Sequence, residues 1–138
     1  MVEKLFLDAN ILFSAAYSEK SSLLRLWKLK KTVLYSSLYA IEEANRNLPE
    51  VRQQSHLNQL LNQLEIIRHE HITILLSDDI ILREKDRPIL QAAIHAKAHY
   101  LITGDFRDFG KYFGKSIQNV TILPPVDYFK TRGMGHDK

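Results

Sequence analysis

Near its start the chain carries the stretch Leu5-Phe-Leu-Asp-Ala-Asn10, an apolar run that ends directly at an aspartate. A second stretch, Tyr100-Leu-Ile-Thr-Gly-Asp105, repeats this arrangement far along the chain, and Asp108 follows about one helical turn later. Short apolar runs bounded by polar residues are typical of buried strands. If the two runs are parallel neighbours in one sheet, their carboxylates meet at its carboxyl edge, where open α/β sheets bind ligands.

The composition indicates one globular domain with a normal core: the chain has 138 residues, of which 45% are hydrophobic. It contains no cysteine, which excludes disulfides and thiolate metal sites and suits a reducing compartment, so we expect a cytoplasmic protein. No apolar run approaches the roughly 20 residues needed to span a bilayer, and the N-terminus lacks a secretory pattern, so we expect no membrane partner. The formal net charge of +3 favours a polyanionic partner, because any cluster of acids leaves the remaining surface more basic.

Alternating strand and helix patterns predict the α/β class. We expect strands at residues 3–8, 32–36, 72–76, 100–103 and 120–123, and helices at 21–29, 37–48, 50–68, 86–98 and 126–129. This order predicts a three-layer fold with a central, mostly parallel sheet of about five strands and helices on both faces. A single domain is expected over residues 1–132, followed by a flexible C-terminal tail over 133–138.

The aspartates have a structural explanation as well as a functional one. Asp8, Asp86 and Asp105 each stand at a junction between elements, where a short polar residue can simply cap a helix. Serine or asparagine would serve as a cap equally well, so aspartate at all three favours a need for negative charge. Crowded carboxylates are unfavourable unless a hard cation neutralises them, and Mg²⁺ and Mn²⁺ prefer such oxygen ligands. The pattern therefore predicts a divalent metal site, of the kind used in two-metal hydrolysis of phosphodiesters.

A further carboxylate is expected from the helix that Ser37 caps. Both Glu42 and Glu43 are available there, and helical phase alone does not choose between them. Three arginines flank the acidic positions and are candidates for contacts with phosphate groups: Arg46, Arg87 and Arg107.

Several segments, taken together and in this order, resemble the PIN domain, the nuclease fold that includes VapC-type toxins. They are Leu5-Phe-Leu-Asp8-Ala-Asn10-Ile-Leu, then Ser37 followed by Glu43-Ala-Asn-Arg46, then Lys85-Asp86-Arg-Pro-Ile-Leu-Gln-Ala-Ala, and Tyr100-Leu-Ile-Thr103-Gly-Asp105-Phe-Arg-Asp108-Phe. The closing segment from Val120 to Phe129 matches the family's last strand and short helix. The likeness covers nearly the whole chain.

This resemblance implies an Mg²⁺- or Mn²⁺-dependent ribonuclease that acts on RNA, expected to be single-stranded. Such proteins are often homodimeric and often encoded beside an antitoxin protein. The residues that match the family's functional positions are Asp8, Glu43, Asp86 and Asp105 as the catalytic, metal-holding set, Asp108 as an additional ligand or supporting acid, and Asn10 and Thr103 as polar supports. The family pattern of glutamate, apolar residue, any residue and arginine favours Glu43 over Glu42.

One departure from the family is the run Arg83-Glu-Lys-Asp-Arg87, which surrounds Asp86 with cations that could hold phosphate or lower metal affinity. The alternative reading is a non-catalytic RNA-binding or regulatory module with the same fold. DNA or a structured RNA is a further possible substrate. His95 and His99 stand four residues apart, a zinc-binding spacing on a helix, but no third ligand accompanies them.

Overall fold

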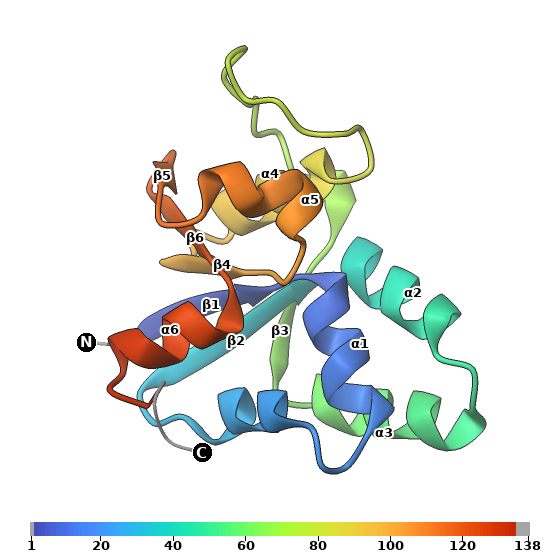
Figure 1. The fold of residues 1–138 in the computed structure, drawn as a ribbon. Helices are drawn as coiled ribbons and strands as arrows, with labels where there is room; N and C mark the ends of the chain where they lie inside the picture. The colour runs from blue at the N-terminus through green and yellow to red at the C-terminus, as the bar shows by residue number, and fades with distance from the viewer. Residues whose placement is uncertain (1, 135–138) are drawn as a thin grey trace.

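A six-stranded sheet forms the centre of the computed structural model, which describes residues 2–134 (Figure 1). The strands are β1 (Glu3–Leu7), β2 (Thr32–Ser37), β3 (Leu64–Ile67), β4 (Tyr100–Ile102), β5 (Ser116–Ile117) and β6 (Val120–Leu123). Their order across the sheet is β3-β2-β1-β4-β6-β5, and every neighbouring pair is parallel except β5 with β6. Chain order therefore reverses between β1 and β4, which makes their carboxyl ends the place where such sheets bind ligands.

The central strand β1 is apolar because it is covered on both faces, and Leu5, Phe6 and Leu7 are completely buried. The helices are α1 (Ala9–Tyr17), α2 (Leu38–Asn47), α3 (Val51–Leu61), α4 (Arg87–His95), α5 (Phe106–Phe109) and α6 (Pro125–Thr131). Figure 1 shows α4 on one side of the sheet and α1 and α6 on the other. The predicted α/β class, with a mostly parallel sheet between helices, is confirmed.

Several helices begin where the sequence places a capping side chain. The Ser37 hydroxyl accepts a hydrogen bond from the backbone N–H of Ala40 and starts α2, as predicted. Asp8 accepts from the amide of Ala9 at the start of α1. Glu50 and Gln53 form a reciprocal capping box at the start of α3. The predicted helix over 21–29 is present as a 3₁₀ segment, Ser22–Lys28.

The prediction of one helix over residues 50–68 is wrong in its second half. Helix α3 ends at Leu61, and Leu64–Ile67 form the edge strand β3, which pairs in parallel with β2. Leu57, Leu60, Leu61 and Leu64 keep a helical spacing across the break, so the pattern could not show it. Residues 64–67 form hydrogen bonds with the edge of the sheet. The stabilisation from this pairing outweighs what these residues would gain by continuing the helix.

The strand predicted over residues 72–76 is also wrong, because this segment is an irregular connection without strand pairing. Ile72, Ile74 and Leu76 pack against the core, whereas Thr73 and Leu75 between them are exposed. This alternation resembles that of a strand. However, the edge of β2 pairs with β3, so residues 72–76 do not pair there. Figure 1 shows the long connection from β3 to α4 (yellow-green) standing away from the sheet.

The sequence reading also missed the short strand β5 and the one-turn helix α5. Of the predicted C-terminal tail, residues 135–138 lie outside the described part of the chain. Within residues 2–134, no helix combines the length and apolar character needed to cross a membrane.

Removing a core side chain on α4 should destabilise the fold. Leu90 is fully buried, so Leu90→Ala is expected to lower the free energy of unfolding by about 2 to 5 kcal/mol through lost burial and a residual cavity. The matched control Leu75→Ala removes a side chain that is 86% exposed and should change it by less than about 0.5 kcal/mol. Urea denaturation followed by circular dichroism measures both, and equal effects would contradict the assigned core.

Candidate functional site

The carboxyl ends of β1 and β4 lie side by side because Leu7 pairs with Ile102. The backbone N–H of Asp8 donates to the carbonyl of Ile102 at 3.1 Å, which extends this pairing by one residue. The two apolar runs are thus parallel neighbours, and Asp8 after one strand meets Thr103 after the other at the edge of the sheet. Asp105, whose carboxylate the sequence placed beside that of Asp8, stands two residues further on, in the turn after β4.

Asp8 is 5% exposed and its carboxylate is held by several donors. Oδ1 accepts from the Ala9 amide at 2.6 Å, while Oδ2 accepts from the Thr103 hydroxyl at 2.8 Å and from the Asn10 side-chain amide at 3.2 Å. Burial raises the pKa of Asp8 to about 6, although the hydrogen bonds from Thr103 and Ala9 oppose the rise. The negative charges of Glu43 and Asp105 raise this pKa further, so the three carboxylates lie within electrostatic reach of one another.

Asn10 and Thr103 connect Asp8 to the segment that carries Asp105. The Thr103 hydroxyl also accepts from the backbone N–H of Asp105 at 3.1 Å. The Asn10 side-chain oxygen accepts from the backbone N–H of Gly104 at 2.9 Å. These contacts tie the turn after β4 to Asn10 and to the end of the strand.

Asp86, Asp105 and Asp108 come together from two different segments. Each offers one carboxylate oxygen, and these oxygens all lie within 4.8 Å of one another. Asp105 and Asp108 belong to one turn, in which Asp105 Oδ1 accepts from the Asp108 amide at 3.1 Å and caps α5. Asp86 immediately precedes α4 and is 5% exposed. Asp8 is not part of this close group and adjoins it through Asp105.

The Asp86 carboxylate is the least satisfied polar group of the cluster. Its Oδ2 atom is buried and has no hydrogen-bond partner among residues 2–134. Burial raises the pKa of Asp86 to about 6, with Asp108 adding to the rise and Lys85 opposing it. A buried carboxylate oxygen without a donor is unfavourable, and a cation beside it would satisfy it.

Two of the cations that flank Asp86 in sequence contact the acids. Arg83 donates to Asp108 Oδ2 from Nε at 2.9 Å and from Nη2 at 2.6 Å, and this contact holds the pKa of Asp108 below its usual range. The Lys85 ammonium lies 3.5 Å from Asp86 Oδ1. The sequence showed these cations beside Asp86, but not that Arg83 binds an acid from another segment.

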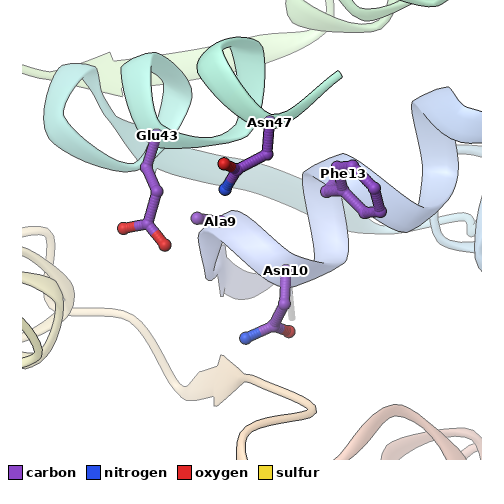
Figure 2. A pocket seen from close by; sticks show the side chains of 5 residues that line it. All are labelled: Ala9, Asn10, Phe13, Glu43 and Asn47. Carbon is purple, nitrogen blue, oxygen red and sulfur yellow. The ribbon is translucent and has the colours of Figure 1, made fainter. Parts of the chain in front are cut away.

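Glu43 on α2 lies close enough for its charge to act on Asp8. It lines a pocket of about 280 Å³ between α1 and α2, together with Ala9, Asn10, Phe13 and Asn47. Figure 2 shows Glu43 and Asn47 on α2, opposite Asn10 on α1. Glu42, its neighbour in sequence, is exposed. Asn47 was missed by the sequence reading, although its position one helical turn after Glu43 places it on the same face.

The remaining candidates differ in accessibility. Arg46 and Arg107 are exposed, whereas Arg87 is partly buried and donates to the Ile80 carbonyl at 3.4 Å. His99 Nδ1 accepts from the Lys4 amide at 2.9 Å, so this nitrogen already serves the backbone and not a zinc site with His95. The indole N–H of Trp27 donates to the Leu60 carbonyl at 3.0 Å and joins the 3₁₀ segment to α3.

The donors of the cluster fit a hard divalent cation. They are all carboxylate oxygens, they come within reach of one ion, and one of them is buried without a hydrogen-bond partner among the described residues. Oxygen ligands of this kind suit Mg²⁺ or Mn²⁺ better than softer metals. The arrangement can therefore hold a divalent cation at the carboxyl edge of the sheet.

The family of the chain follows from sequence comparison. A family model described as the PIN domain matches residues 4–107, so the chain belongs to the PIN domain family, whose members are in general nucleases. Its fold is similar to that of a chain in the crystal structure of VapBC2 from Rickettsia felis bound to a DNA fragment from their promoter. That chain has 20% sequence identity and a TM-score of 0.63, and the match covers 88% of this chain and 98% of that one. At this identity the likeness concerns the fold alone. A search of curated proteins found no match.

Burial of Asp8 should make stability depend on pH in metal-free protein. Asp8 keeps its proton up to about pH 6 when folded but loses it near 3.8 when unfolded, so the folded state is progressively disfavoured as pH rises from about 4 to about 6. The asparagine in Asp8→Asn does not titrate, so the free energy of unfolding of this variant should rise relative to that of wild type by about 2 to 3 kcal/mol as pH goes from about 4 to about 6. Urea titrations in EDTA at several pH values measure the difference, and a pH-independent difference would count against the raised pKa.

Proposed function

We propose that this protein is a metal-dependent endoribonuclease that hydrolyses RNA phosphodiester bonds, and that it is the toxin of a toxin–antitoxin pair. The observation that carries the proposal is the convergence of acids from separate segments on one edge of the sheet. Asp86, Asp105 and Asp108 lie within reach of one ion, and Asp8 adjoins them. Membership of the PIN domain family supports the same chemistry.

In this proposal Asp8, Asp86 and Asp105 hold a Mg²⁺ or Mn²⁺ ion, with Asp108 as a further acid of the centre. When bound, the ion would activate the attacking water and neutralise charge on the phosphate. Thr103 and Asn10 orient the carboxylate of Asp8 through the hydrogen bonds described above. Such outer contacts commonly change metal affinity or activity by about 10- to 100-fold when they are removed.

In this proposal Glu43 completes the catalytic set from helix α2. Its carboxylate lines the pocket beside Asn10, and its charge acts on Asp8. Glu42 points to solvent in the same helix. We therefore assign the helical carboxylate to Glu43.

The substrate we propose is single-stranded RNA. The net charge of the chain is +3 in spite of the acidic centre, so positive charge elsewhere on the surface can attract a polyanion. Arg46 and Arg107 are exposed and Arg87 is partly so, which suits contacts with phosphate groups that position the strand. An antitoxin partner and a homodimer are proposed from the family and from the fold shared with a chain of the VapBC2 complex.

A non-catalytic module with this fold is the second candidate. It would have little need for a buried Asp86 oxygen that accepts no hydrogen bond from the described residues, or for acids whose burial raises their pKa. Both features are unfavourable for stability, and both are useful where a cation has to bind.

An RNA cleavage assay tests the proposed activity. Single-stranded RNA should be cleaved in Mg²⁺ or Mn²⁺, and EDTA should abolish cleavage. Asp8→Asn and Asp105→Asn should each lower the rate at least about 100-fold, because a direct ligand should matter more than the outer contacts discussed above. Cleavage that survives both EDTA and these substitutions would rule out the metal mechanism. Replacing the RNA with DNA of the same sequence tests the substrate.

Thermal stability separates a metal centre from a structural cluster of acids. Mn²⁺ should raise the melting temperature of wild type, since a ligand that binds only the folded state stabilises it. The double variant Asp8→Asn/Asp105→Asn should not respond. Metal stabilisation without RNA cleavage would favour the non-catalytic module.

The choice of the helical carboxylate is tested by a matched pair of neighbours. Glu43→Gln should lower the cleavage rate by about 10-fold or more, whereas Glu42→Gln should stay within about 2-fold of wild type, because only the first side chain lines the site. The two variants are compared by their RNA cleavage rates at the same metal concentration. The reverse order of effects would reassign the role to Glu42.

A further inference from the structure

Arg83 lies against two acids of the centre. Its Nε and Nη2 groups both donate to Asp108 Oδ2, at 2.9 and 2.6 Å. Nε also lies 3.7 Å from Asp86 Oδ2. The Asp108 side chain is 9% exposed and that of Arg83 is 49% exposed, so the guanidinium covers the acid from the solvent side.

The position of Arg83 follows from local backbone structure. Its carbonyl accepts from the amides of Asp86 and Arg87 at 2.9 and 3.2 Å, which forms the turn that leads into α4. The Tyr39 hydroxyl donates to the Lys85 carbonyl at 2.7 Å and joins this turn to α2. The arginine is therefore carried by an anchored turn, three residues before the acid that it adjoins.

This contact divides the oxygens of the cluster into two kinds. Asp108 Oδ2 accepts two charge-assisted hydrogen bonds, which are among the stronger ones in proteins. A divalent ion at the same oxygen would have to lie against the positive guanidinium. Asp86 Oδ2, in contrast, is buried and accepts no hydrogen bond in the described part of the chain, although Arg83 Nε lies 3.7 Å from it and Lys85 Nζ lies 3.5 Å from Oδ1. A divalent ion can therefore bind Asp86 without breaking a hydrogen bond, whereas at Asp108 Oδ2 it would have to displace Arg83.

We propose that the Arg83 guanidinium stands in for a second metal ion, so that the centre takes a single divalent ion at Asp8, Asp86 and Asp105 while Asp108 holds Arg83. This inference rests on the metal centre of the proposed function and specifies its stoichiometry. Arg83 is a positioning residue in this scheme, because it acts through Asp108. The sequence left open whether the centre holds one ion or two, and this proposal gives it one ion and one built-in cation.

The experiment counts Mn²⁺ ions bound per chain, by electron paramagnetic resonance of free Mn²⁺ during titration and by calorimetry. Wild type should bind one ion. Arg83→Gln frees Asp108 and should bind two. The double variant Arg83→Gln/Asp108→Asn lacks the freed carboxylate and should return to one. Arg107→Gln, which removes an exposed arginine between Asp105 and Asp108, should stay at one and controls for a general loss of positive charge.

Two ions bound by wild type, or one ion bound by folded Arg83→Gln, would overturn the inference and leave metal-dependent cleavage standing. Two ions retained by the double variant would also overturn it, because the second ion would then not depend on Asp108. No Mn²⁺ binding by wild type would overturn both the inference and the proposed function. Circular dichroism checks that each variant is folded. If a variant does not fold, the number of Mn²⁺ ions bound by the wild type still tests the proposal of a single ion.

Discussion

The parallel pairing of β1 with β4 is the constraint on which the site depends. It joins two segments that are nearly a hundred residues apart and ends where Asp8 contacts Thr103. Because β1 is buried on both faces, a shift of its register would expose or displace apolar side chains throughout the core. The burial of Leu5, Phe6 and Leu7 thus positions Asp8, although none of these three residues has a chemical role.

The site gathers negative charge in a place from which water is largely excluded. Burial raises the pKa of both Asp8 and Asp86 to about 6, and one oxygen of Asp86 has no hydrogen-bond partner among the described residues. Arg83 and Lys85 neutralise part of this charge from the turn before α4. A stable core would not need such a cluster, and proteins commonly accept local destabilisation of this kind where function requires it. The negative charge that remains to attract a divalent cation depends on how much positive charge Arg83 and Lys85 already supply.

The elements that the sequence predicted correctly are those with both a pattern and a boundary signal. The strands before Asp8 and Asp105 and the helix capped by Ser37 belong to this group. The errors fall on residues 64–67 and 72–76, where apolar spacing fits more than one structure. There the choice depended on which segment could pair with the free edge of β2, and pairing partners are not visible in a local pattern.

The sequence by itself determined the α/β class and the placing of acids at the ends of elements, because these depend on local spacing, and its match to a family model determined membership of the PIN domain family. The family resemblance already favoured Glu43 over Glu42, and the structure brings the charge of Glu43 within reach of Asp8. Only the tertiary structure decided that Arg83 binds Asp108 across 25 positions of the chain. The reason is physical: the direction of a side chain and the partner that it meets depend on how helices pack against the sheet, which involves residues far apart in sequence.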